Sequence, residues 1–253
     1  MEESESLSWS EVLRIIQSVP CNDPQLQRLG DTAQVDGDTR VLELADTLTL
    51  TGQCWASHFG CPIEVNTAAG FFAQADKPAP PPDASGEDPD YALAFEFTPR
   101  PGALRYDCVL WGLDAPMAAA ELERACQKIR AALNVNGCLL LSIPVRVGVR
   151  PTAAEVDAFY AELGAAPLAL PQHVSASLEA SGFEPLSVEF TPNRQALARY
   201  RMIESALERC RTATDAARSR WKREVKLFLK EGGVSFFPSA VFTARRWEYV
   251  DGS

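Results

Sequence analysis

The chain has 253 residues, of which 46% are hydrophobic and 23% are charged. This composition is typical of a globular protein with a full hydrophobic core, and it excludes an intrinsically disordered chain. The formal net charge of −10 repels phosphate backbones, so we expect a small molecule or a protein surface as the partner rather than nucleic acid.

The seven cysteines are scattered along the chain and form no CxxC pair, so we expect no metal site. The N-terminus, MEESESLSW, is acidic and lacks the apolar segment of a signal peptide. No apolar run approaches the roughly 18 residues that a membrane-spanning helix needs. We therefore expect no membrane contact and a cytoplasmic protein with reduced thiols.

Two short helices are predicted ahead of the first strand. Ser8 and Glu11 fit a capping box, which begins an amphipathic helix over residues 8–17. Residues 24–29 predict a second helix. Residues 1–39 are therefore predicted to form a helical cover for the α/β domain that follows.

Alternating strands and helices predict a doubly wound, mostly parallel α/β sheet over residues 40–253. The last strand is expected to lie antiparallel at the sheet edge. The predicted strands are Val41–Leu44, Pro62–Asn66, Ala92–Phe97, Tyr106–Trp111, Cys138–Val145, Leu186–Phe190 and Val234–Trp247.

Helical periodicity is found between these strands. The predicted helices are Thr51–Phe59, Met117–Leu133, Thr152–Leu163, His173–Ser181 and the long stretch Arg194–Lys230, which forms a helical insertion over residues 193–231. Residues 77–90 contain five prolines and predict a loop where one more helix would be regular. Residues 134–137 predict a turn.

The stretch RVLELADTLTLTGQCWASHFG, from Arg40 to Gly60, predicts a strand, a tight loop and a helix, the opening unit of a nucleotide-binding α/β domain. It resembles the first motif of class I S-adenosylmethionine-dependent methyltransferases, whose usual form is close to VLDxGCGTGxxxxxLAxxFG. Where that family has Gly-x-Gly-x-Gly, this chain has Ala45-Asp46-Thr47-Leu48-Thr49.

A longer block carries the same resemblance. The run YDCVLWGLDAP…LERACQKIRAALNVNGCLLLSIP, which begins at Tyr106, is similar to the family's fourth strand, helix and fifth strand, with its spacing kept. LEASGFEPLSVEF, which begins at Leu178, is again similar to the family. The resemblance implies a Rossmann-like, seven-stranded methyltransferase fold with a helical insertion before the last strand, and S-adenosylmethionine as cofactor.

In the family, the cofactor lies at the carboxyl ends of the first, second and fourth strands. Glu43 matches the first-motif acid; it either holds the amino group of the methionine moiety or is tied to neighbouring loop N–H groups. Threonine at positive φ is strained by about 1–3 kcal/mol, so we expect either a changed loop conformation or a different binding of the methionine portion. The hydroxyls of Thr47 and Thr49 then either bind the cofactor carboxylate or close the turn.

The remaining expected site residues also come from the resemblance, except His173, which is a candidate because a histidine side chain can remove a proton. Asn66 replaces the acid that binds the ribose, which loses a charge-assisted gain of about 1 kcal/mol. Asp114 and His173 are the candidates for orienting an acceptor and removing a proton, although Asp114 also suits loop packing. The residues expected to bind the cofactor are Glu43, Ala45, Asp46, Thr47, Thr49, Asn66, Trp111 and Gly112.

Two functional classes follow from these observations. The first is an S-adenosylmethionine-dependent methyltransferase that acts on a small-molecule acceptor. The alternative is a catalytically inactive methyltransferase-like domain that serves as a binding or scaffold subunit, which the absent glycines and Asn66 favour. A third hypothesis is another nucleotide-binding α/β protein, such as a dehydrogenase, although the chain has no GxGxxG motif. The acceptor and the oligomeric state are not readable from the sequence.

Overall fold

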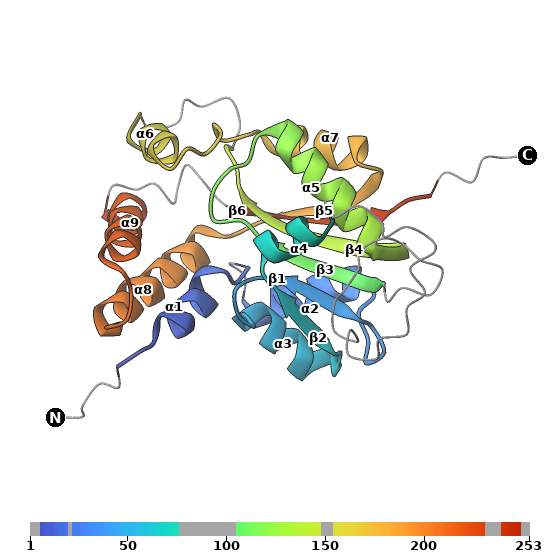
Figure 1. Cartoon of the computed structure of the whole chain (residues 1–253), viewed down its shortest axis with the longest axis horizontal. Helices are drawn as coiled ribbons and strands as arrows, with labels where there is room; N and C mark the ends of the chain where they lie inside the picture. The colour runs from blue at the N-terminus through green and yellow to red at the C-terminus, as the bar shows by residue number, and fades with distance from the viewer. Residues whose placement is uncertain (1–5, 20–21, 76–104, 148–153, 231–238, 249–253) are drawn as a thin grey trace, which may run out of the picture.

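A computed structural model describes residues 6–19, 22–75, 105–147, 154–230 and 239–248 (Figure 1). The predicted strand Ala92–Phe97 and the proline-rich loop lie outside these residues. The described strands form one sheet in the order β2-β1-β3-β4-β6-β5, so the predicted doubly wound fold is confirmed with six described strands rather than seven. They are β1 (Val41–Leu44), β2 (Ile63–Asn66), β3 (Tyr106–Gly112), β4 (Leu133–Pro144), β5 (Phe183–Phe190) and β6 (Ser239–Arg246).

The parallel part of the sheet comprises β2, β1, β3 and β4. Strand β6 is antiparallel, as predicted, but the prediction that it lies at the edge is wrong, because it pairs with both β4 and β5. Its residues Val241 and Phe242 are fully buried, which suits a central strand covered on both faces. The predicted turn over residues 134–137 is also wrong. Strand β4 runs through it, with Asn136 in the left-handed region at φ 64°, which asparagine tolerates.

The helices agree with the predictions except at two places. Helix α4 was not predicted, and the long stretch after residue 193 is broken between α8 and α9. The helices are α1 (Trp9–Ile16), α2 (Asp23–Thr32), α3 (Leu50–Phe59), α4 (Ala68–Ala75), α5 (Ala119–Ala132), α6 (Ala154–Glu162), α7 (Pro171–Ala180), α8 (Asn193–Arg209), α9 (Asp215–Val225) and the π-helical turn η2 (Lys226–Lys230). The predicted capping box of Ser8 and Glu11 is present on α1.

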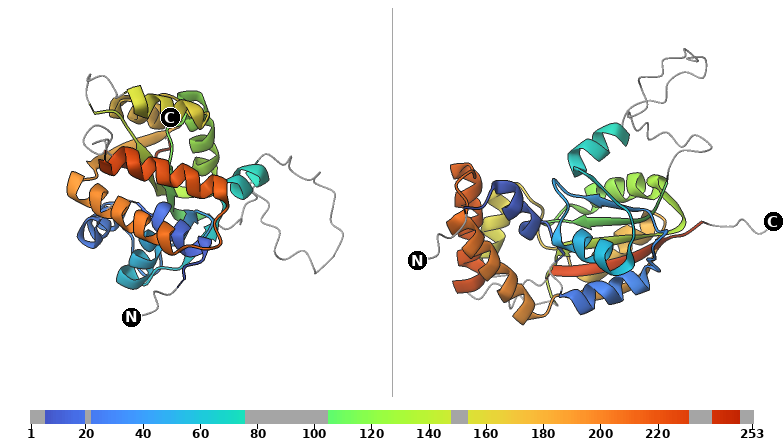
Figure 2. Two further views of the ribbon diagram at one scale, coloured as in Figure 1. Left: turned by 90° about the vertical axis from the view of Figure 1, so that its left-hand side faces the viewer. Right: turned by 90° about the horizontal axis from the view of Figure 1, so that it is seen from below.

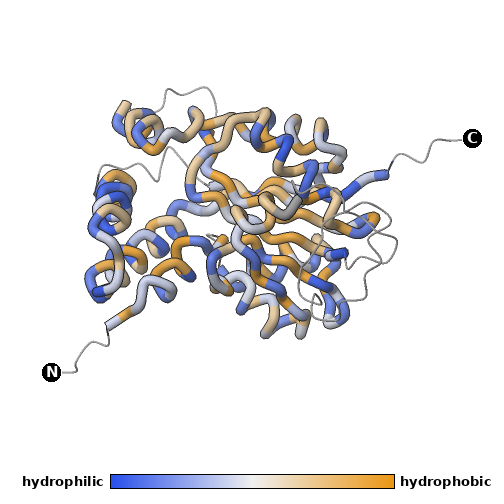
Figure 3. The backbone as a smooth tube through the Cα atoms, viewed as in Figure 1, coloured by the Kyte–Doolittle hydropathy of each residue, from blue (hydrophilic) through white to orange (hydrophobic). Residues whose placement is uncertain are grey.

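Alternating side chains of the strands supply two apolar layers. Leu139 and Leu141 of β4 face the side covered by α5 and α7, and Leu140 faces the side covered by α2 and α3. Figure 2 shows these helices on opposite faces of the sheet. In the tube of Figure 3, the strands at the centre are predominantly hydrophobic. No helix within the described ranges is long and apolar enough to cross a membrane.

A third apolar cluster joins α1, α6, α8 and α9 into a helical cap. Ala115, which follows β3, packs against it. Leu168 belongs to it and precedes Ala169, whose carbonyl accepts from the N–H of Arg146 just after β4. The cap therefore lies at the carboxyl ends of the parallel strands, where an open α/β sheet binds its ligands. The two N-terminal helices are divided: α1 packs in the cap, whereas α2 packs against α3 and the sheet.

The indole of Trp55 is fully buried, and its N–H donates to the carbonyl of Leu26 at 2.9 Å, which joins α3 to α2. Trp55→Phe removes this bond and leaves a small void, so we expect the free energy of unfolding to fall by about 1–3 kcal/mol. Urea denaturation followed by circular dichroism measures it. Trp247→Phe is the control, because Trp247 is 56% exposed and should change stability by about 0.5 kcal/mol or less.

Candidate functional site

The register of the parallel strands brings most of the expected cofactor residues to one edge of the sheet. Leu44, the last residue of β1, is level with Asn66 on one side and with Trp111 on the other. The loop after β1, the end of β2 and Gly112 at the end of β3 therefore meet at the carboxyl edge. This is the position at which the family resemblance places the cofactor.

Glu43 fixes the loop after β1. Its side chain is buried, with Oε2 accepting from the Thr49 backbone N–H at 2.9 Å and Oε1 accepting from the Thr49 hydroxyl at 2.5 Å. Burial raises the pKa of this carboxyl, while hydrogen bonds from Thr49 and Gly52 act in the opposite direction. Of the two alternatives for Glu43, the structure shows the contact with neighbouring loop N–H groups.

The loop takes a path that needs no residue in the left-handed region. Neither Thr47 nor Thr49 has a positive φ, and Thr49 is the extended N-cap of α3, its oxygen accepting from the N–H groups of Thr51 and Gly52. The glycine that the loop does need is Gly52, where an added Cβ would lie 2.6 Å from Oε2 of Glu43. The sequence analysis did not single out Gly52. The signal that could have identified it is a glycine in the first turn of a helix, where glycine is otherwise unfavourable.

Residues Gln17, Ser18 and Val19, here called the closing segment, lie against this loop. The Gln17 side chain makes two hydrogen bonds to Asp46: its Nε2 donates to Oδ2 at 2.6 Å, and its Oε1 accepts from the backbone N–H at 3.0 Å. The backbone N–H of Asp46, one of the expected cofactor donors, is therefore already bonded to the protein itself.

Ser18 and Val19 are bonded to the start of α3, and the Gln17 backbone lies against the end of β3. The Thr51 hydroxyl accepts from Val19 N–H at 2.8 Å, and the Ser18 hydroxyl accepts from Leu50 N–H at 3.0 Å. At the end of β3, a Cβ added to Gly112 would lie 2.7 Å from the carbonyl oxygen of Gln17. Gly112 thus permits a close approach, as expected, but the group that approaches is the chain's own backbone.

Asn66 and Trp111 form the other side of the edge. The Asn66 carbonyl accepts from the N–H of the buried Ala45 at 3.0 Å, and the Asn66 side chain is half-buried. Trp111 is only 2% exposed, and its ring meets that of Phe72 of α4 edge-on at 5.5 Å. In the described residues, Trp111 is thus a core side chain at the end of β3.

The two candidate proton-removing residues are not brought together. Asp114 forms an ion pair with Arg220 of α9, with Oδ2 and Nη2 2.7 Å apart. His173 lies exposed in the first turn of α7, where its backbone N–H bonds to the Leu170 carbonyl. The sequence did not identify Arg220 as a partner, because it follows Asp114 by 106 residues.

A buried acid lies in the cap near this ion pair. Oε1 of Glu224 accepts from the Tyr200 hydroxyl at 3.0 Å, whereas Oε2 is buried without a partner among the described residues. Burial raises the pKa of Glu224 to about 7, with Asp114 adding to the rise and Arg220 opposing it. Nothing in the sequence distinguished Glu224 from the exposed acids of the same helices.

No family model and no curated protein sequence matches the chain. Solved structures do match its fold. They include the cyclase SpnF (TM-score 0.57, 15% identity, 96% of this chain and 98% of that one) and the cyclopropane synthase MmaA2 from Mycobacterium tuberculosis (0.55, 12%, 88% and 83%). A third is geranyl diphosphate C-methyltransferase from Streptomyces coelicolor A3(2), solved with S-adenosyl-L-homocysteine (0.53, 10%, 88% and 79%).

These similarities confirm the fold inferred from the sequence. The chain has the Rossmann-like fold of class I S-adenosylmethionine-dependent methyltransferases. Because the same fold serves a cyclase, a cyclopropane synthase and a methyltransferase, the fold alone does not assign a reaction.

Glu224 predicts a pH-dependent stability. Between about pH 4.5 and 7 the unfolded chain has lost the Glu224 proton while the folded protein keeps it, so folding becomes less favourable as the pH rises. Relative to Glu224→Gln, which keeps an acceptor for Tyr200, the wild-type free energy of unfolding should fall by up to about 3 kcal/mol between pH 5 and 8.

Urea denaturation at both pH values measures this difference. Glu208→Gln on α8 is the matched control, because Glu208 is exposed and its replacement should leave the pH dependence unchanged. A wild type and a Glu224→Gln variant with parallel pH profiles would contradict the prediction.

Proposed function

We propose that the chain is an S-adenosylmethionine-dependent methyltransferase that acts on a small-molecule acceptor. The observation that carries the proposal is the register that places the loop after β1, Asn66 and Gly112 side by side at the carboxyl edge of the sheet. The formal net charge of −10 supports a small acceptor rather than nucleic acid.

The residues present fit the cofactor in part. Asn66 has an amide for a ribose hydroxyl, and Thr47 offers a half-exposed hydroxyl to the methionine portion. Gly112 provides the space that a side chain would fill, but the Gln17 carbonyl now lies against it. Glu43 serves to position the loop through Thr49 rather than to contact the cofactor.

The cofactor supplies an electrophilic methyl group on a sulfonium when it is bound. The chain then has to align the acceptor and exclude water, since an in-line methyl transfer needs no obligatory acid or base. The helical cap stands at the correct edge for both tasks. Asp114, oriented by Arg220, is the group that would accept a proton from the acceptor, and His173 is the second candidate.

A non-catalytic binding or scaffold role is the second candidate function. It is favoured by the closing segment, which uses the Asp46 N–H and occupies the space beside Gly112. If this arrangement is permanent, the protein keeps the methyltransferase architecture without a cofactor site. The two candidates differ in one measurable property, which is cofactor affinity.

We expect S-adenosylmethionine and S-adenosylhomocysteine to bind at micromolar concentration in calorimetry, and to stabilise the protein by about 2.7 kcal/mol at 100 times the dissociation constant. Gln17→Ala should tighten binding severalfold, because it removes two hydrogen bonds that hold the closing segment on Asp46. Gln172→Ala is the control, because Gln172 is exposed on α7.

The outcomes separate the two candidate functions. Binding by the wild type, tightened in Gln17→Ala, supports the methyltransferase. Absence of binding at millimolar cofactor in both proteins, with the variant folded by circular dichroism, rejects it in favour of the scaffold role.

A further inference from the structure

Charge is distributed unevenly between the C-terminal helices α8, α9 and η2, which form part of the cap, and the rest of the chain. From Asn193 to Lys230, which covers α8, α9 and η2, there are eleven Lys and Arg against four Asp and Glu, a formal charge of +7. The remainder has thirteen against thirty, or −17. A positive region on an acidic protein attracts anions to itself, so a ligand held by these helices is expected to be negatively charged.

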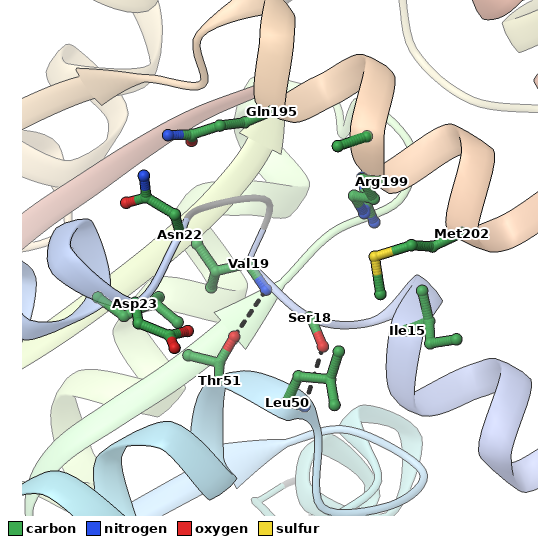
Figure 4. A pocket seen from close by; sticks show the side chains of 12 residues that line it. Ile15, Ser18, Val19, Asn22, Asp23, Leu50, Thr51, Gln195, Arg199 and Met202 are labelled. Atoms are coloured by element: carbon green, nitrogen blue, oxygen red, sulfur yellow. Dashed lines mark hydrogen bonds between the residues drawn. The ribbon is translucent and has the colours of Figure 1, made fainter.

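A cavity of about 270 Å³ lies between α8 and the N-terminal helices (Figure 4). Its walls are mainly apolar and come from α1, the closing segment, α2, the start of α3 and α8; they include Ile15, Val19, Leu26, Leu50, Ala198 and Met202. At about 30 Å³ per water, the volume corresponds to roughly nine to ten non-hydrogen atoms. The cavity suits a small molecule with an apolar body.

Arg199 is the cation that lines this cavity. Its Nη2 donates to the carbonyl of Ile16, while its Nη1 makes no hydrogen bond to a described residue. No carboxylate of the described residues forms an ion pair with it. The positive charge of Arg199 lowers the pKa of Glu224, but burial keeps that pKa at about 7. Near neutral pH Glu224 is therefore only partly ionised and does not fully neutralise Arg199. The guanidinium thus has donor capacity and positive charge to offer a ligand.

The other charged group of the lining is Asp23, at the start of α2. It is exposed, and Figure 4 shows it on the wall opposite Arg199. Water and salt screen an exposed carboxylate more than they screen the half-buried Arg199. Between these two groups Gln195 also projects from α8 (Figure 4). The positive charge of Arg199 is therefore screened less than the negative charge of Asp23, and an anion is favoured next to Arg199 on α8.

We propose that this cavity binds a small carboxylate with an apolar body of about seven carbons, with the carboxylate on Arg199 and the body against Leu50, Val19 and Met202. The site does not depend on the proposed methyl transfer. A ligand there would rest on Ser18 and Val19, whose hydrogen bonds to α3 form part of the wall.

The test is a calorimetric titration of the full chain, without cofactor, with octanoate at pH 7.5 and low salt. We expect a dissociation constant on the order of 0.1–1 mM for a ligand of this size. Binding should weaken at least tenfold in Arg199→Gln and change less than twofold in Arg201→Gln. Arg201 is the matched control, because it lies two residues away on α8, is exposed and does not line the cavity.

A second variant covers the case in which Arg199→Gln loses stability together with its bond to Ile16. Ala198→Trp fills the cavity but leaves Arg199 in place, and it should also abolish octanoate binding while circular dichroism shows a folded chain. Octylammonium, which has the same number of carbons as octanoate and the opposite charge, should not bind. Equal octanoate affinity in the wild type and both variants, or octylammonium binding as tight as octanoate, would overturn the proposal.

Discussion

The buried contact between Glu43 and Thr49 is the constraint on which the functional edge depends. A strand carboxylate inside a protein is unfavourable unless its oxygens accept hydrogen bonds, and here both are used by one residue, through its N–H and its hydroxyl. Thr49 in turn caps α3. The same pair therefore fixes the direction in which the first helix leaves the sheet and the path of the loop between them, without any residue in the left-handed region.

The closing segment follows from that loop. Because the path after β1 leaves the N–H of Asp46 and those at the start of α3 facing α1, the chain satisfies them with Gln17 and Ser18. Helix α8 is joined to the end of α1, directly before this segment, through Arg199, which donates to the carbonyl of Ile16. One continuous set of hydrogen bonds therefore links the sheet edge, the N-terminal segment and α8.

The likeness to a cyclase, a cyclopropane synthase and a methyltransferase at 10–15% identity fits a scaffold whose chemistry is set by edge and cap residues. In this chain the loop has threonines where the resembled motif has glycines, Asn66 has an amide where that motif has an acid, and Asp114 is engaged by Arg220. The basic helices α8, α9 and η2 stand against an acidic remainder of the chain, and this charge separation favours anionic ligands at those helices. Function here is a property of the site rather than of the fold.

The sequence by itself determined the alternation of strands and helices, the capping box of Ser8 and the block from β3 to β4, because each depends on local periodicity or on spacing along the chain. It also located the loop after β1 and showed that its glycines had gone. It could not determine that β6 enters the sheet between β4 and β5, that Gln17 meets Asp46 from 29 residues away, or that Arg220 meets Asp114 across 106. Those contacts join segments that share no local pattern, and only the packing of helices and strands around a common core decides which polar groups are left facing one another.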